Sequence, residues 1–87
     1  MNKPGLVSAQ FNLGLALMHQ AKNAQAKAEF QAVIQSNPND YEAHYYLGIM
    51  LLGEGRKDSA IFHLGKALES PSPQLRTAAS MAMQRVK

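Results

Sequence analysis

Residues 9–17 read AQFNLGLAL, and 34 positions later residues 43–51 read AHYYLGIML. Sliding the chain over itself by 34 residues extends this match in both directions without a gap. The identical pairs include Ala9 with Ala43, Leu13 with Leu47, Gly14 with Gly48, Leu17 with Leu51, Ala26 with Ala60 and Ser36 with Ser70. Self-similarity at a fixed period of about 20 to 50 residues is the signature of a repeat protein. The sequence therefore predicts two copies of one structural unit.

Each period contains two amphipathic segments, in which apolar residues recur three or four positions apart. The segments cover residues 6–18, 24–34, 41–52 and 60–68, the first of them starting at Leu6. Ala21-Lys22-Asn23 separates the first two and Gly53-Glu54-Gly55 the last two. Such short connections leave room only for a tight antiparallel turn. We expect two helical hairpins.

A proline-containing segment ends each hairpin. In Asn37-Pro38-Asn39-Asp40 the proline disfavours helix in the residue before it, and Asn39 with Glu42 predicts a capping box for the next helix. In Ser70-Pro71-Ser72-Pro73, Ser72 is placed to cap a helix and Pro73 to stand in its first turn. We therefore expect a fifth helix that ends near Val86.

On these residues the chain resembles the tetratricopeptide repeat family, over nearly its whole length. The matches to the family motif are Leu13, Gly14, Ala26, Phe30 and Pro38 in the first unit, and Leu47, Gly48, Ala60 and Ala67 in the second. His44 stands where the family prefers Trp, and Leu64 where it prefers an aromatic residue. The resemblance implies an all-α fold, a right-handed superhelical stack of two antiparallel hairpins with a C-terminal fifth helix. It implies one domain over residues 1–87, with repeats at about 7–40 and 41–74 and a capping helix at about 73–86.

The physical basis of this pattern is the alternation of small and large residues on facing helices. Small residues (Gly14, Gly48, Ala26, Ala60 and Ala67) let neighbouring helices approach closely, and we expect Leu13, Leu17, Phe30, Leu47, Leu51 and Leu64 to fill the spaces around them. Ala21 stands where the second unit has Gly55. Because a non-glycine residue with positive φ is strained, the first turn is the less favourable one.

The resemblance also implies a concave face, lined by the first helix of each unit, on which another protein binds. The expected partner-binding residues are Phe11, Asn12, Leu15, His19, Glu42, Tyr45, Tyr46 and Ile49. An aromatic centre with a polar rim suits an amphipathic helix or an extended apolar peptide, with Tyr45 as the main anchor. Alternatively, Phe11 and Tyr45 pack against each other or against the fifth helix.

One subtype of the family grips a C-terminal carboxylate with Lys, Asn and Arg side chains along this face. Here the corresponding positions are Phe11, Leu15, Tyr46 and Ser80, and only Arg76 nearby is basic. The sequence therefore argues against recognition of an acidic tail.

The fifth helix has two interpretations. Leu75, Met81, Met83 and Val86 could close the open end of the second hairpin, because terminal repeats need a polar outer face to stay soluble. The same residues could instead mediate self-association, since methionine-rich faces adapt to several partners.

Catalytic, metal and cofactor sites are not expected. The chain has no cysteine, and His19, His44 and His63 are too dispersed for a ligand pair at helical spacing. No pair of acids forms a convincing dyad, and Gly53-Glu54-Gly55 lacks the Lys and Ser or Thr of a phosphate loop.

The net charge and the length of the apolar runs limit the kinds of partner that the chain can bind. The net charge is +3 with basic residues scattered singly, which disfavours nucleic acid, and no apolar run reaches the roughly 20 residues needed to span a membrane. As written, the chain is expected in the cytoplasm; for a fragment of a longer protein, the sequence does not give the compartment. Two functions remain, a protein-binding scaffold and a structural module for homo-oligomerisation or spacing within a larger protein.

Overall fold

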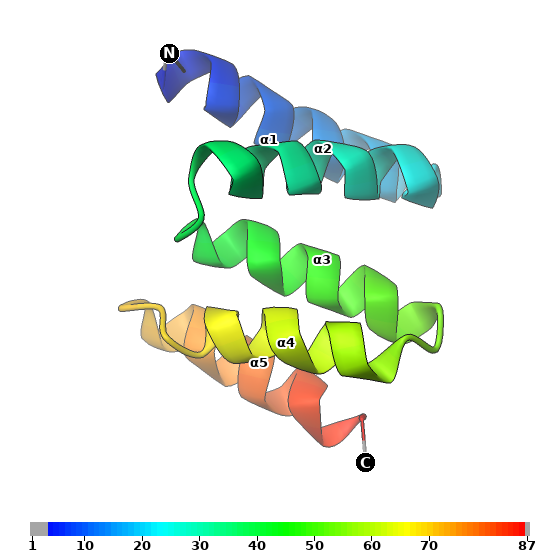
Figure 1. The fold of residues 1–87 in the computed structure, drawn as a ribbon, viewed down its shortest axis with the longest axis vertical. Coiled ribbons are helices and arrows are strands. Elements are labelled where there is room, and N and C mark those ends of the chain that lie inside the picture. The colour runs from blue at the N-terminus through cyan, green and yellow to red at the C-terminus, as the bar shows by residue number, and fades with distance from the viewer. Residues whose placement is uncertain (1–3, 87) are drawn as a thin grey trace.

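The computed structural model describes the backbone of residues 4–86 and the side chains from Ala9 to Val86. This part of the chain forms five helices, namely α1 (Pro4–His19), α2 (Asn23–Ser36), α3 (Tyr41–Gly53), α4 (Lys57–Ala67) and α5 (Pro73–Gln84) (Figure 1). The predicted all-α repeat fold is confirmed. The Leu6 side chain and residues 1–3 and 87, which the sequence assigns to the same domain, lie outside the described part.

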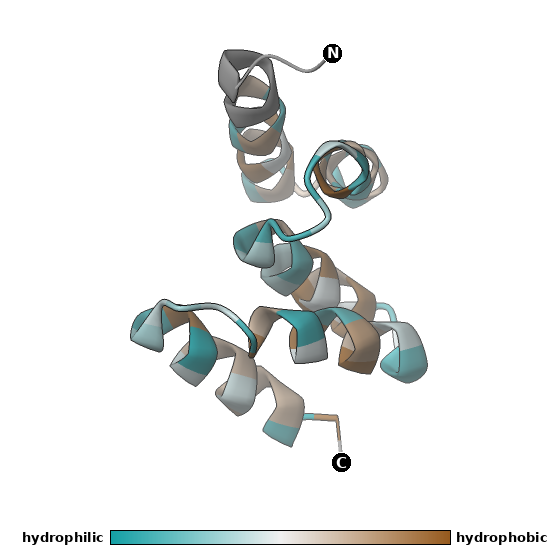
Figure 2. Ribbon diagram, turned by 60° about the vertical axis from the view of Figure 1, so that its left-hand side comes forward, coloured by the Kyte–Doolittle hydropathy of each residue, from teal (hydrophilic) through white to brown (hydrophobic). Residues whose placement is uncertain are grey.

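The helices stack in the order of the chain. α1 packs against α2, α3 against α4, and α2 joins the two hairpins by packing against α3. α5 then packs against α4 and α3. α1, α3 and α5 therefore follow one another along one side of the molecule, with α2 and α4 on the other (Figure 2). α5 thus occupies the place that the first helix of a third unit would take.

Both hairpin turns have the same backbone geometry. Ala21 has φ 62° and Gly55, which is 34 residues later, has φ 79°. The amide of Lys22 donates to the carbonyl of Leu17 at 2.8 Å, and that of Arg56 to Leu51 at 3.0 Å. A residue in the left-handed conformation, followed by an amide that donates to the carbonyl five residues earlier, is the Schellman motif that ends a helix. The first turn therefore keeps the geometry of the second, and Ala21 adopts a positive φ that is strained for a non-glycine residue.

Close approach of the helices within each hairpin depends on one glycine. A Cβ atom on Gly14 would lie 2.9 Å from the Phe30 ring, and one on Gly48 would lie 2.8 Å from Leu64 Cγ. Phe30 and Leu64 are themselves fully buried, together with Ala26, Ala60 and Ala67. The two units therefore share the same glycine-against-large-residue contact, 34 residues apart.

One packing expectation is wrong at the first unit. Leu13 was expected to fill a space between helices, but it is 47% exposed, whereas the equivalent Leu47 is 1% exposed. Met81, the equivalent residue on α5, is 60% exposed. α3 packs against a second helix on either side, α2 and α4, while α1 packs mainly against α2, and α5 mainly against α4. This position is therefore buried only where second helices flank it on both sides.

The N-terminal cap of α3 differs from the predicted one, whereas that of α5 agrees with it. Asp40, and not Asn39, caps α3, because its carboxylate accepts from the Ala43 amide at 3.0 Å. The predicted capping box of Asn39 with Glu42 is therefore wrong by one residue. Ser72 caps α5 as predicted, accepting from the Leu75 amide at 3.3 Å, and Pro73 is the first helical residue.

Candidate functional site

A cavity of about 640 Å³ opens between the N-terminal halves of α3 and α5. Its α3 wall carries Tyr41, Glu42, Tyr45 and Tyr46, and the facing wall carries Pro71, Leu75 and Ala78. Asn39-Asp40 and Ser70–Ser72, the loops that precede the two helices, close its end. We refer to it as the α3–α5 groove.

Tyr46 forms the rigid floor of the groove, because it belongs to a cluster of aromatic rings. It stacks on the buried Phe30 with centroids 5.7 Å apart and an interplanar angle of 13°, and meets Phe11 at 5.9 Å. Phe11 in turn packs edge-on against Phe30 at 5.6 Å. Tyr45 meets Tyr46 at 5.2 Å and 70°. Three helices therefore fix the rings on which a ligand would rest.

The ionisable groups of the groove are acidic and phenolic. The Asp40 carboxylate is engaged as the cap of α3, while Glu42 is exposed in the first turn. Burial raises the pKa of the Tyr46 hydroxyl, and the charges of Glu42 and Tyr45 raise it further. None of the described residues that line the groove is Lys or Arg.

The predicted partner-binding residues fall into three groups. Glu42, Tyr45 and Tyr46 line the α3–α5 groove. Phe11, Leu15 and Ile49 are half-buried, the first two packed against the core, and Asn12 and His19 are exposed on α1. The ring contacts of Phe11 are with Phe30 and Tyr46, so the alternative in which Phe11 packs on Tyr45 finds no support in them.

Only part of the α5 side of the groove follows from the family positions, which include Ser80 and Arg76 but not Leu75. Leu75, which the sequence assigns either to a cap of the second hairpin or to self-association, is half-buried and lines the groove opposite the tyrosines. Met83 and Val86 are half-buried and Met81 is exposed. The 34-residue period contained the missing signal, because it aligns Leu75 with Tyr41 and so places the fifth helix beside α3 on the same face.

The profile of the tetratricopeptide repeat family matches residues 11–75. This chain belongs to the tetratricopeptide repeat family. It is also 36% identical over 61 residues to the cellulose synthase operon protein C of Salmonella typhimurium (strain LT2), a match that covers 70% of this chain and 5% of that protein. The match thus spans a small fraction of that relative's length. No solved structure matches the chain. Tetratricopeptide repeats generally mediate protein–protein interaction and are typically non-catalytic scaffolds.

The tetratricopeptide position that the family fills with Trp holds His44 here, and the structure pairs it with His63. The two Nδ1 atoms lie 2.9 Å apart, and His44 Nε2 lies 2.8 Å from the carbonyl oxygen of Pro38. Since a carbonyl only accepts, His44 Nε2–H donates to Pro38, and its Nδ1 then accepts from His63 Nδ1–H. Pro38, expected to be a packing residue, is exposed and contributes this carbonyl.

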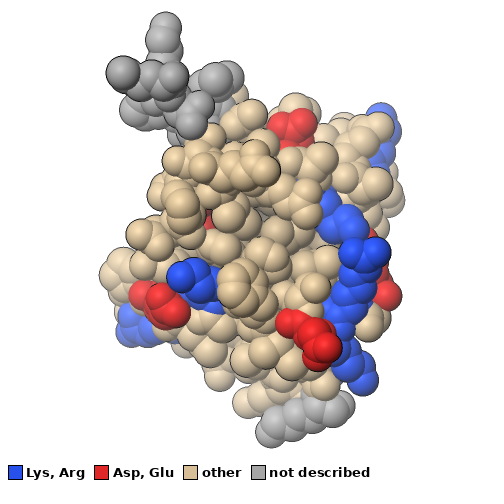
Figure 3. Space-filling view, viewed as in Figure 1, with Lys and Arg blue, Asp and Glu red and all other residues tan. Residues whose placement is uncertain are grey.

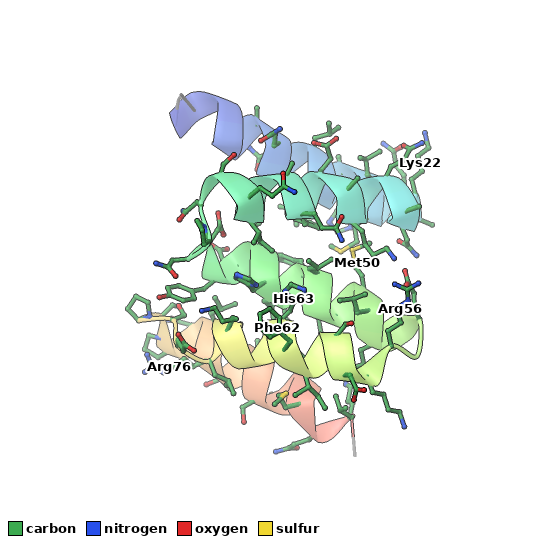
Figure 4. The ribbon with its side chains drawn as sticks, viewed as in Figure 1. Lys22, Met50, Arg56, Phe62, His63 and Arg76 are labelled. Carbon is green, nitrogen blue, oxygen red and sulfur yellow. The ribbon has the colours of Figure 1, made fainter. Side chains whose placement is uncertain are left out.

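His44 and His63, which are too far apart in sequence for a ligand pair at helical spacing, meet across two helices. They are 19 positions apart in sequence, but α3 and α4 are antiparallel and bring them together. Burial, and secondly the charge of His44, lowers the pKa of His63. Figure 4 labels His63 next to Phe62 on α4. Their rings meet edge-on, with centroids 5.1 Å apart. Across the described residues, no three His, Cys, Asp or Glu side chains gather as metal ligands would.

Basic residues of this tetratricopeptide pair gather at the edge where the two hairpin turns lie. Figure 3 shows a blue band along that edge, where Figure 4 labels Lys22 and Arg56, and a smaller group of blue atoms at the opposite edge, where Figure 4 labels Arg76. Lys27 joins the two hairpins at the same edge through an ion pair with Glu54 at 2.7 Å. The loops that close the α3–α5 groove lie at the opposite edge (Figure 1).

Between residues 4 and 86, no helix is both long and apolar enough to cross a membrane.

Proposed function

We propose that this chain is a protein-interaction scaffold whose concave face, formed by α1, α3 and α5, binds an apolar or amphipathic peptide or helix of another protein. The observation that supports this proposal is the α3–α5 groove, with Tyr41, Tyr45 and Leu75 on its walls. Ligand sites in proteins are typically clefts of about 300 to 1,000 Å³ with apolar and aromatic walls. The groove has that size and that lining.

The tyrosines suit this role because they are held in place before a ligand arrives. Tyr46 is stacked on Phe30, and Tyr45 rests edge-on against Tyr46. A side chain that is already ordered loses little rotamer entropy on binding, and tyrosine is enriched among the residues that dominate interface energies. Phe11, Leu15 and Ile49 extend the apolar face along α1 and α3, and Asn12 and His19 supply polar groups at its rim.

The test compares the wild type with Tyr45→Ala in affinity capture from the native cell, followed by mass spectrometry. A partner retained by the wild type should be lost with Tyr45→Ala, because the variant removes the half-buried ring that faces Leu75 across the groove. Ser59→Ala, at an exposed position on α4, is the matched control and should retain the partner. Equal capture by Tyr45→Ala and the wild type would count against the groove.

A structural module for homo-oligomerisation, or for spacing within a larger protein, is the second candidate. It is favoured by the exposure of Leu13 at one end of the stack and Met81 at the other, at the position where Leu47 is buried. The relative from Salmonella is far longer than the matched segment, as expected if such units serve inside larger chains.

Light scattering distinguishes this module from the scaffold. If the wild type self-associates through α5, Met81→Glu should lower the mass in solution to that of a monomer while leaving circular dichroism unchanged, since the side chain is exposed. A monomeric wild type would exclude homo-oligomerisation as the role of this module and leave spacing, which loss of a captured partner with Tyr45→Ala would in turn disfavour.

A further inference from the structure

The α3–α5 groove has a charge opposite to that of the whole molecule. The chain carries nine Lys and Arg against six Asp and Glu, for a net charge of +3. The groove nevertheless includes two of the acids, Asp40 and Glu42, and none of the basic residues. We propose that the groove binds a peptide segment in which a lysine or arginine stands beside apolar residues. This inference rests on the proposed peptide-binding function and names the chemistry of its partner.

Glu42 is the carboxylate available to such a cation. Asp40 already accepts a hydrogen bond from the Ala43 amide, and its charge is offset by the positive end of the α3 dipole. Glu42 is exposed, and the ion pairs of the described residues involve Glu54 and Glu69 instead. A cation that enters the groove therefore finds an acid with no competing ion pair.

The tyrosines provide the second half of the cation site. Tyr45 and Tyr46 stand three and four residues after Glu42, so the three side chains share one face of α3. Glu42 is close enough to Tyr46 to raise the pKa of its hydroxyl. A Lys or Arg head group is attracted to aromatic faces as well as to carboxylates, and its methylene stem packs on apolar surface.

Other ligands fit the groove less well. An acidic segment would meet Glu42 without a compensating base in the lining, because Arg76 lies outside it and its Nη1 already donates to the Ser70 carbonyl at 2.8 Å. A wholly apolar segment would cover the Glu42 carboxylate and remove water from it without replacing the lost hydrogen bonds, which is unfavourable. A segment with one cation between apolar side chains satisfies the carboxylate and fills the space between Tyr45 and Leu75.

The test is selection from a random displayed library of peptides about twelve residues long, with the chain as bait. Peptides enriched by the wild type should carry Lys or Arg next to apolar residues, and synthetic copies should bind Glu42→Gln about three- to fivefold more weakly at low salt. Asp58→Asn is the matched control, because it removes one exposed acid from α4 outside the groove lining. It should bind within about twofold of the wild type.

The outcomes separate this inference from the function on which it rests. If the selected peptides lose affinity for Tyr45→Ala but bind Glu42→Gln as tightly as the wild type, the groove binds peptides and the cationic preference is wrong. Enrichment of acidic or purely apolar peptides has the same meaning. If no peptide is enriched, or if Tyr45→Ala binds as well as the wild type, the peptide-binding groove itself is refuted.

Discussion

Ala21 and Gly55 hold the same left-handed backbone conformation at equivalent places in the two hairpins. Only glycine adopts this conformation without steric cost. In any other residue the Cβ atom comes too close to the following carbonyl oxygen, which costs roughly 1 to 2 kcal/mol of conformational free energy. The structure thus contains a strained turn and an unstrained turn of the same design, and each can be converted into the other by one substitution.

We predict that Ala21→Gly raises the free energy of unfolding by about 0.5 to 1 kcal/mol, because relief of strain exceeds the added chain entropy of glycine. The reverse change, Gly55→Ala, should lower it by about 1 kcal/mol; no atom lies within 4 Å of the added Cβ, so backbone strain is the cause. Urea unfolding followed by circular dichroism measures both. Opposite signs for the two variants are essential, and two destabilising changes would contradict the argument.

The burial of His63, together with its contact with His44, makes the free energy of unfolding depend on pH. The pKa of His63 is lowered from its ordinary value of 6.5, so between 6.5 and the folded value the unfolded chain binds more protons than the folded one. The stabilisation is therefore fully present above pH 6.5 and is lost as the pH falls through the folded pKa. We expect urea midpoints to decrease over this window.

His63→Gln tests the assignment, because glutamine can still donate to His44 Nδ1 but does not titrate. The variant should show a flatter decline of the urea midpoint below pH 6.5 than the wild type. His19→Gln, at an exposed position on α1, should keep the wild-type slope. An identical pH profile for His63→Gln would mean that other groups carry the dependence.

At the scale of the helices, glycine has different roles in α3 and α4. A methyl group on Gly48 would lie 2.8 Å from Leu64 Cγ and 3.3 Å from the Leu64 backbone nitrogen, whereas nothing lies within 4 Å of one on Gly65. Gly48→Ala should therefore destabilise the fold by about 1 to 3 kcal/mol through overpacking, in spite of its better helix propensity. Gly65→Ala should stabilise it by up to about 1 kcal/mol. Thermal unfolding of Gly48→Ala and Gly65→Ala measures both effects. A stabilised Gly48→Ala would contradict the prediction, because it would show that α3 and α4 can move apart without loss of stability.

The helices were predictable from sequence, but their ends and long-range neighbours were only partly so. Asp40 and Asn39 are both good caps, and the choice of Asp40 depends on the backbone of the Asn37–Asp40 loop. The meeting of His44 with His63 depends on the relative rotation of α3 and α4, which helical periodicity alone does not determine. The family positions of Tyr45 and Tyr46 place them on the α3 wall of the groove, and the 34-residue period places Leu75 beside α3, but the depth of the groove between them depends on how α5 packs on α3.

For the whole molecule, the 34-residue period predicts the stack, but burial depends on how many units flank each position. Leu13, Leu47 and Met81 are equivalent in sequence, and their exposures of 47%, 1% and 60% follow from the second helices beside them. Residues at equivalent positions of a sequence repeat therefore need not contribute equally to the free energy of unfolding. The expected burial of Leu13 is wrong because the family motif describes a unit with neighbours on both sides, whereas α1 packs mainly against α2.

These exposures predict three different costs for truncating the same motif position. Leu47→Ala should lower the free energy of unfolding by about 2 to 4 kcal/mol, because it opens a cavity between α2, α3 and α4. Leu13→Ala and Met81→Ala should each cost about 1 kcal/mol or less, since much of either side chain already contacts water. Urea unfolding at low protein concentration measures all three, and Leu47→Val against Leu13→Val serves if Leu47→Ala is too unstable to titrate. Should Met81→Ala be as damaging as Leu47→Ala, the α5 face must be covered in solution, most simply by a second copy, and the dependence of its midpoint on protein concentration would then reveal that contact.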